Sequence, residues 1–179
     1  MSGNDNIFLI GFMGVGKSTN GALLSSMLAT DFIETDRLIE NRCGMSIPDI
    51  FKIHGEAFFR EQEISILQSL GDLGCEGSVV SCGGGIVTSA WCRAFLKKQP
   101  FSVLLTASVE NCYRRTLHSD RPLLQTADPM AQISRLMQER HNWYFEAANW
   151  IVNTDSRLPQ EVCIEIIKML NLRIRSEIR

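Results

Sequence analysis

Residues 11–18 of the chain have the types and spacing of a phosphate-binding loop. They read Gly-Phe-Met-Gly-Val-Gly-Lys-Ser and match G-x-x-x-x-G-K-[ST] at every fixed position. The glycines let the backbone turn its N–H groups inward around a phosphate, and a following helix directs its positive dipole end to the same place. Lys17 should reach the β- and γ-phosphates of a nucleoside triphosphate, and the Ser18 hydroxyl should ligate Mg²⁺. The pattern therefore predicts triphosphate binding.

The context of this loop supports the prediction. The apolar run at 6–10 is expected to form a buried strand that ends at the first glycine, and 18–29 has helical spacing of apolar residues. A glycine-rich turn that matches by chance would lack this strand–loop–helix setting. Triphosphate binding alone leaves the use of the nucleotide open, so a nucleotide-dependent switch or regulatory module stands beside an enzyme.

The rest of the chain alternates short apolar runs with helical patterns. Further strands are expected at 32–33, 78–81, 101–105 and 150–152, and helices over 36–43, 47–73 and 159–174. This alternation predicts an α/β fold in which helices cover both faces of a parallel sheet, with sites beyond the carboxyl ends of its strands. We expect a single domain over residues 1–179.

Composition favours small-molecule partners. The net charge of −2 is dispersed, so the chain has no basic stripe for nucleic acid or an anionic membrane, and no apolar run is long enough to cross a bilayer. Six cysteines occur without a C-x-x-C pair or metal-like spacing, which is typical of free thiols in a reducing compartment. Since the start of the chain also lacks a signal-like pattern, we expect a cytoplasmic protein.

With these features placed, the chain resembles the shikimate kinases over nearly its whole length. The resemblance is carried by GFMGVGKST at 11–19, ETDRLIE at 34–40, FFREQE at 58–63, SCGGG at 81–85, RPLL at 121–124 and R-x-x-x-Y at 140–144. Each motif is short, but together and in the family's order they are specific. The resemblance implies a monomeric P-loop kinase, similar to nucleoside monophosphate kinases, with three α/β/α layers and a five-stranded parallel sheet of order 2-3-1-4-5.

The same resemblance implies transfer of the γ-phosphate of MgATP to the 3-hydroxyl of shikimate. A substrate carboxylate needs guanidinium forks, for which Arg60 and Arg140 are the candidates. Asp36 would accept a hydrogen bond from the reactive hydroxyl and take its proton, and Glu63 would hold Arg60 in place. Three consecutive glycines would let the substrate approach the backbone, namely Gly83, Gly84 and Gly85.

The nucleotide side is assigned in the same way. Mg²⁺ would be ligated directly by Ser18 and through water by Ser81 and Glu34, the last standing where the family usually has the first Asp of Asp-x-Asp. Contacts to ATP are expected from the phosphate loop and from two later arginines of the adenine end, that is from Gly14, Val15, Gly16, Lys17, Ser18, Thr19, Arg115 and Arg157.

A loop at about 116–128 has no clear periodicity and is expected to close as a lid over both substrates. Arg121 would enter the site on closure, offset charge on the transferred phosphoryl group and contact both ATP and shikimate, which makes Asp36, Lys17 and Arg121 the expected catalytic residues. Two alternatives remain at this point: a kinase for another small hydroxy acid such as gluconate, and a degenerate inactive member, at which the Glu34 substitution hints.

Overall fold

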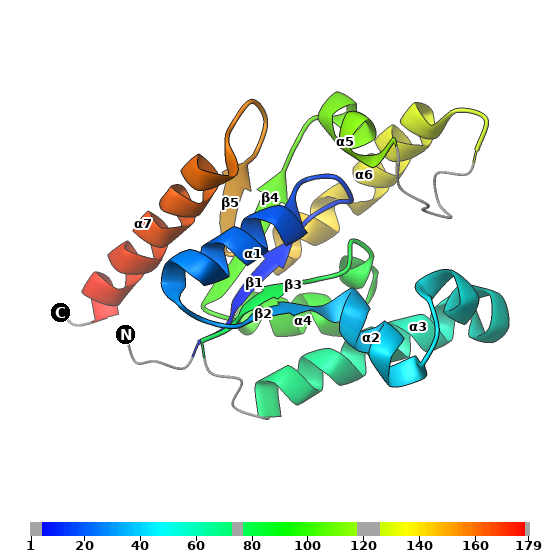
Figure 1. The fold of residues 1–179 in the computed structure, drawn as a ribbon, viewed down its shortest axis with the longest axis horizontal. Coiled ribbons are helices and arrows are strands. Elements are labelled where there is room, and N and C mark those ends of the chain that lie inside the picture. Colours follow the sequence, from blue (N-terminus) through cyan, green and yellow to red (C-terminus); the bar gives the residue numbers. More distant parts are fainter. Residues whose placement is uncertain (1–4, 73–76, 118–125, 178–179) are drawn as a thin grey trace.

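The strands form one parallel sheet, as the sequence predicts. A computed structural model describes residues 5–72, 77–117 and 126–177. Within them, five strands pair in the order β2-β3-β1-β4-β5, which confirms the expected order. The strands are β1 (Ile7–Ile10), β2 (Phe32–Glu34), β3 (Val79–Ser81), β4 (Phe101–Thr106) and β5 (Trp150–Asn153). Their parallel direction brings all the carboxyl ends to one edge of the sheet (Figure 1).

Helices cover both faces of this sheet (Figure 1). On one face α1 packs against α7, and on the other α4 packs against α6. The helices are α1 (Lys17–Leu28), α2 (Thr35–Cys43), α3 (Ile47–Asp72), α4 (Ala90–Lys98), α5 (Val109–Thr116), α6 (Pro129–Ala147) and α7 (Pro159–Glu177), with a 3₁₀ turn at Ile86–Thr88. The arrangement is the three-layer α/β/α architecture expected from the alternation of strand and helix patterns.

The central strands are buried on both sides, which is why they read as continuous apolar runs. All four residues of β1 are buried, and β1 pairs with β3 through Ile7 and Val79 and with β4 through Ile7 and Phe101. At the edge of the sheet β5 is only partly covered, and Ile151 keeps 47% of its surface exposed. The core of the protein is therefore centred on the middle strands of the sheet, and β5 is a partly covered edge strand.

A helical hairpin of α2 and α3 extends beyond the end of β2 (Figure 1). α2 begins directly after β2 and ends at Cys43, where it is capped by Gly44, whose φ of 66° lies in the left-handed region typical of helix C-caps. α3 is not one straight helix, because Gly55 has φ 81° and ψ 172° and bends the chain. The bend separates the first turns of α3 from the part that carries Glu56 and Arg60.

The segment expected to act as a lid lies largely beyond the described residues. α5 ends at Thr116, and the description resumes at Thr126, just before Asp128 caps the N-terminus of α6. Arg121 lies outside the described residues, so its expected role stays a prediction. Across 5–72, 77–117 and 126–177, no helix combines the length and the apolar character needed to span a bilayer.

Candidate active site

The phosphate loop, residues 11–18, connects β1 to α1 at the carboxyl edge of the sheet. Gly11, Gly14 and Gly16 have φ values of 141°, 79° and 92°, which residues with a Cβ atom adopt only with strain. Gly14 also lies against α5, where a Cβ atom would come 2.7 Å from the carbonyl oxygen of Cys112. The motif glycines are therefore required both by the turn and by its packing.

Lys17, the first residue of α1, is bent back over the loop. Its Nζ donates hydrogen bonds to the carbonyl oxygens of Gly11 at 2.7 Å and of Phe12 at 2.9 Å. The ammonium charge is thereby held at the mouth of the loop, beside the N-terminus of α1, where two sources of positive potential favour a bound phosphate.

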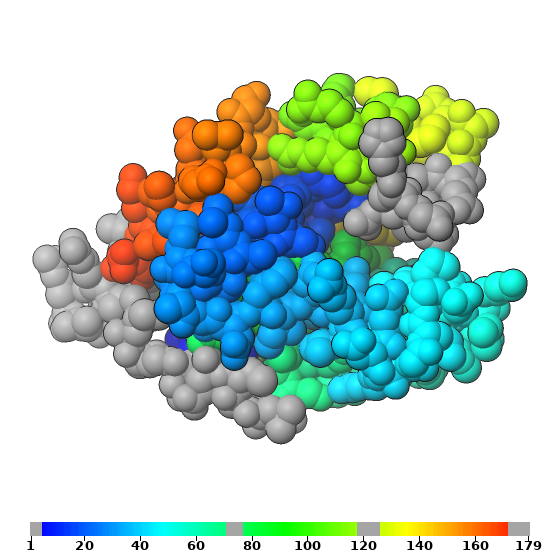
Figure 2. Space-filling model, in the orientation of Figure 1, coloured from blue at the N-terminus to red at the C-terminus, as the bar shows by residue number. Residues whose placement is uncertain are grey.

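A polar cavity opens in front of the loop. Its volume is about 410 Å³, within the range of about 300–1,000 Å³ of small-molecule sites. Figure 2 shows the surface hollowed between α5 and the α2–α3 hairpin, with the dark blue of the phosphate loop inside the hollow. The cavity brings together residues of the loop, of the ends of β2 and β3, and of α5, which are Gly14, Gly16, Lys17, Ser18, Thr19, Glu34, Asp36, Ser81, Cys82, Gly84 and Arg115.

The oxygen donors in this cavity suit Mg²⁺. Ser18, Glu34 and Ser81 all line it, and hydroxyl and carboxylate oxygens are the ligands this hard cation prefers. Glu34 also forms an ion pair with Arg37 of α2, with 2.9 Å between its Oε2 and Nε of the arginine. The side chain of Glu34, one methylene longer than that of Asp, therefore reaches α2 as well as the cavity. Among the described residues no group of three His, Cys, Asp or Glu side chains that could hold a metal ion is found.

Three consecutive glycines after β3 each face a different expected substrate-binding group. A Cβ atom on Gly83 would lie 2.5 Å from Oδ1 of Asp36 and 3.0 Å from Oε1 of Glu63. On Gly85 it would collide with the guanidinium group of Arg60. Residues 83–85, here called the glycine strip, have no side chains, and the acidic Asp36 and the basic Arg60 can therefore both approach their backbone.

The middle glycine is held from α6. The carbonyl oxygen of Gly84 accepts hydrogen bonds from Nη1 of Arg140 at 3.3 Å and from the hydroxyl of Tyr144 at 2.5 Å. Arg140 is only 8% exposed, and its i,i+4 spacing from Tyr144 puts both side chains on the buried face of the helix. The glycine strip thus links the arginine of α6 to Asp36 of α2.

Thr35 connects this strip to α2 and was not singled out from the sequence. Its fully buried hydroxyl accepts the backbone N–H of Gly83 at 3.0 Å. The available signal was its position between Glu34 and Asp36, at the start of the helix.

The Thr35 hydroxyl is expected to contribute measurably to stability. Thr35→Val keeps the shape but leaves the buried Gly83 N–H without an acceptor, which should lower the free energy of unfolding by about 1–3 kcal/mol in urea denaturation. Thr35→Ser retains the hydroxyl and is the matched control. Equal stability of the two variants would show that this hydrogen bond does not hold the strip.

Arg60 is surrounded by carboxylates. Its Nη1 donates to Oε2 of Glu63 at 2.7 Å, while Nε and Nη2 both donate to Oε1 of Glu56, at 3.2 and 2.8 Å. Glu63 is 1% exposed, and its second oxygen has no hydrogen-bond partner among the described residues. The pairing of Arg60 with Glu63 is the one expected from the sequence.

Burial raises the pKa of Glu63 to about 7, against the lowering effect of Arg60 and with a further raising effect from Asp36. In the unfolded chain the same carboxyl has its ordinary pKa of 4.5. Between these values the folded protein binds more protons than the unfolded one, so this group makes the folded state less stable as the pH rises from 4.5 to about 7.

Replacing Glu63 by Gln should therefore flatten the pH dependence of stability across that window. We expect the urea midpoint of the parent protein to fall more steeply with rising pH than that of Glu63→Gln. Glu139→Gln, which removes a half-exposed carboxylate from α6, is the control. Parallel slopes in the parent and Glu63→Gln would contradict the raised pKa.

The arginines expected at the adenine end differ in their surroundings. Arg115 lines the cavity and donates to the carbonyl oxygen of Gly14 at 3.2 Å and to Oγ1 of Thr154 at 3.1 Å, which ties α5 to the phosphate loop and to the end of β5. Arg157 is not among the residues lining the described cavity. It donates to the carbonyl oxygen of Asn153 at 3.0 Å and pairs with Glu165 of α7 at 2.6 Å.

Two of the described cysteines near the site have thiols that burial keeps protonated. Cys82 lies beside the glycine strip and lines the cavity, but burial raises the pKa of its thiol far above the ordinary value. Burial also raises the pKa of Cys112 to about 11. The described cysteines are free thiols, as the sequence predicts, and the two named here stay protonated at neutral pH.

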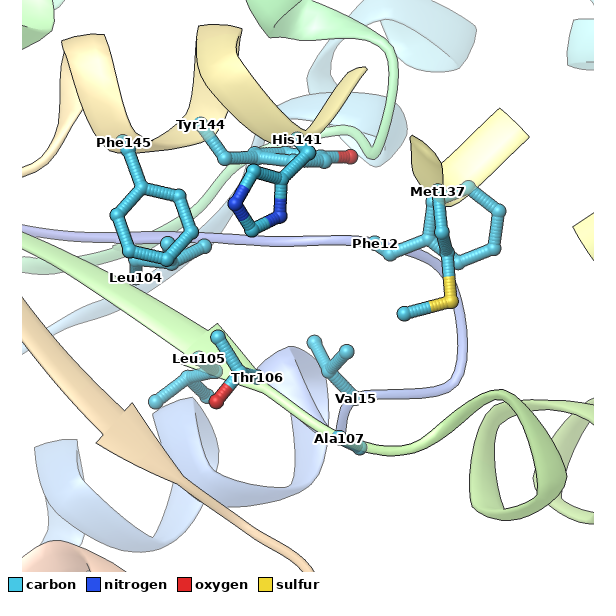
Figure 3. Close-up of a pocket in the computed structure, with 10 residues that line it drawn as sticks. All are labelled: Phe12, Val15, Leu104, Leu105, Thr106, Ala107, Met137, His141, Tyr144 and Phe145. Atoms are coloured by element: carbon cyan, nitrogen blue, oxygen red, sulfur yellow. The ribbon is translucent and has the colours of Figure 1, made fainter. Parts of the chain in front are cut away.

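A second cavity, of about 60 Å³, lies between the phosphate loop, the end of β4 and α6 (Figure 3). Its walls include Phe12, Met137 and Leu104. The rings of His141 and Phe145 also line it and pack together, with 4.5 Å between their centroids. Among the described residues, no Asp, Glu, Lys or Arg side chain lines this cavity. The apolar cavity therefore does not suit a phosphate or a carboxylate, and the polar one is the candidate site.

Comparison with known proteins agrees with this geometry. The family model for shikimate kinase matches residues 13–171. A shikimate kinase of Nitrosospira multiformis is 41% identical over 172 residues, which are 96% of this chain and 87% of that protein. A solved shikimate kinase from Acinetobacter baumannii, in complex with shikimate, is 33% identical with a TM-score of 0.89 and covers 95% of this chain and 94% of that chain.

The likeness to a gluconokinase is weaker. The structure from Sinorhizobium meliloti is 16% identical, with a TM-score of 0.57 over 97% of this chain and 98% of that chain, which is a likeness of fold alone. The matched motifs extend from the phosphate loop through the glycine strip to α6, and relatives at 41% and 33% identity span nearly the whole chain, so the chain belongs to the shikimate kinase family.

Proposed function

We propose that the chain transfers the γ-phosphate of MgATP to the 3-hydroxyl of shikimate. The observation that carries the proposal is the glycine strip: Gly83 faces Asp36, Gly84 is bonded by Arg140, and Gly85 faces Arg60, all beside a phosphate loop. A relative at 33% identity is known in complex with shikimate, a small carboxylate with hydroxyl groups. The side chains that face the strip supply what such a substrate requires: Arg60 and Arg140 for its carboxylate, and Asp36 for its hydroxyl.

The nucleotide would bind with its terminal phosphates on the loop. Backbone N–H groups of Gly14, Val15 and Gly16 and the Lys17 ammonium would hold the phosphates, with Ser18 on the metal ion and Glu34 and Ser81 on its water shell. Bound Mg²⁺ neutralises charge on the phosphates. Arg115 is the better candidate for a contact to the adenine, because it lines the cavity. Arg157 would first have to break its ion pair with Glu165 of α7.

On the acceptor side, Arg60 and Arg140 would bind the substrate carboxylate through charge-assisted hydrogen bonds. That anchor directs the ring toward Gly83, so that the 3-hydroxyl reaches Asp36. The carboxylate of Asp36 would orient the hydroxyl and accept its proton as the hydroxyl oxygen bonds to the γ-phosphorus and the bond from that phosphorus to the leaving ADP breaks. Arg121, on the expected lid, would offset charge on the transferred group.

The proposal is tested by ADP release with and without shikimate. We expect magnesium-dependent ADP formation that requires shikimate, and little release with gluconate, because the chain belongs to the shikimate kinase family and resembles a gluconokinase in fold alone. Equal release without any acceptor would favour a nucleotide-dependent switch. Release with gluconate alone would reassign the substrate and leave the phosphate site intact.

We also propose that the protein is a cytoplasmic monomer. The described cysteines are unpaired thiols, which suits a reducing compartment. Light scattering coupled to gel filtration tests the oligomeric state, with an expected mass near the 20.1 kDa of one chain.

A further inference from the structure

Glu56 is hydrogen-bonded to two nitrogens of Arg60 that a substrate carboxylate would need. A guanidinium group binds a carboxylate best as a fork, with two parallel N–H bonds from neighbouring nitrogens. On Arg60 the fork formed by Nε and Nη2 is taken by Oε1 of Glu56, at 3.2 and 2.8 Å. The remaining nitrogen, Nη1, is engaged by Glu63 at 2.7 Å.

The other fork of Arg60 is covered by backbone. A Cβ atom built on Gly85 would lie 2.5 Å from Nη2 and 2.7 Å from Cζ of Arg60, and would also collide with Nη1. The Nη1–Nη2 end of the guanidinium group therefore packs against Gly85. The fork that faces Glu56 is the one from which a second carboxylate can approach.

Glu56 differs from Glu63 in how easily it can leave. The Glu63 side chain has no exposed surface, whereas that of Glu56 is 61% exposed and can be resolvated by water. Glu56 directly follows Gly55, where the backbone leaves the helical conformation with φ 81° and ψ 172°. An exposed i,i+4 pair contributes little to stability, so displacing Glu56 from Arg60 costs little.

We propose that Glu56 is a placeholder carboxylate that the carboxylate of the substrate displaces from Arg60. This inference rests on the proposed role of Arg60 in substrate binding. In the unliganded protein Glu56 keeps the guanidinium group oriented over Gly85. A ligand must also displace Glu56 to bind the Nε–Nη2 fork of Arg60. Ligands with a carboxylate can do so, whereas neutral ligands cannot. Glu56 thereby sets substrate affinity and selectivity without touching the reacting atoms.

The test is Glu56→Gln, which keeps the size of the side chain and removes its charge. We expect the Kd for shikimate by calorimetry and its KM to fall about two- to fivefold, the worth of an exposed pair, with kcat and ATP affinity unchanged. Glu61→Gln removes the same charge from an exposed neighbour on α3 and should leave all four quantities unchanged. Thermal unfolding verifies that both variants fold.

Other outcomes identify which statement fails. A higher Kd or an unchanged Kd in Glu56→Gln would overturn the placeholder role, and a higher value would make Glu56 a support that positions Arg60 for the substrate. Arg60→Ala separates this result from the proposed function. If Arg60→Ala binds shikimate normally, the role of Arg60 itself is wrong; if it loses binding while Glu56→Gln gains none, only the inference about Glu56 falls.

Discussion

Asp36→Asn should lower kcat with shikimate by a factor of about one hundred or more, while the affinity for MgATP stays within about twofold of the parent value. The amide keeps the size of the side chain but no longer accepts the proton that the 3-hydroxyl loses. ATP binding should be spared because the proposed phosphate contacts come from the loop and Lys17 and do not include α2. Coupled ADP detection gives kcat, and calorimetry gives both affinities.

The control for this substitution is Asp31→Asn, an exposed carboxylate that precedes β2. It should behave as the parent. A second variant, Gly83→Ala, approaches the same group from the backbone, since its new Cβ atom would lie 2.5 Å from Oδ1 of Asp36 and force that carboxylate to move. Normal turnover in Asp36→Asn would refute the role given to Asp36, and normal turnover in Gly83→Ala would show that the carboxylate need not stay where it lies.

The sheet was predictable because its central strands are buried on both faces. Such strands need uninterrupted apolar residues, as in Ile7–Ile10, and each is followed by glycine or a helical pattern. Each strand differs from its expected limits by one residue at one end, as at Phe101–Thr106, because the end of a strand is defined by pairing with its neighbour. The order of the strands came from the family resemblance, since local patterns do not specify which strands pair.

The buried face of α1 shows what local patterns miss. Its spacing of apolar residues predicts a helix correctly, but Met27 is 44% exposed. The buried side carries Asn20, whose amide donates to the carbonyl oxygen of Gly16, and Gly21, which makes room for the ring of Phe32. The helix faces the phosphate loop and β2 there, so polar and small residues are placed by contacts that the sequence alone does not reveal.

Within the site, the parts confined to one short segment were the most predictable. The phosphate loop is contiguous, so its residue types and spacing carry its geometry. The acceptor side is assembled from α2, α3, α6 and the glycine strip, and only the family resemblance gathers these. The pairing of Glu56 with Arg60 follows an i,i+4 spacing, but so do many exposed pairs without function, and its meaning appears only once Gly85 is seen to cover the other fork.

Arg140→Ala should weaken shikimate binding by about tenfold to a hundredfold and leave MgATP binding nearly unchanged. The substitution removes a mostly buried guanidinium group, and a hydrogen bond to a charged group contributes about 1.5–3 kcal/mol. The effect should appear in the Kd for shikimate measured by calorimetry without nucleotide, because the carboxylate is bound before any phosphoryl transfer.

Arg140 also bonds the carbonyl oxygen of Gly84, so its loss could act through the backbone instead of through the substrate. Tyr144→Phe separates the two routes, because it removes the hydroxyl that donates to the same carbonyl oxygen at 2.5 Å and keeps Arg140 itself. If the substrate carboxylate is bound by Arg140, Tyr144→Phe should change the Kd for shikimate far less than Arg140→Ala. Equal losses would mean that α6 acts by placing Gly84, and the carboxylate would then depend on Arg60 alone among these two arginines.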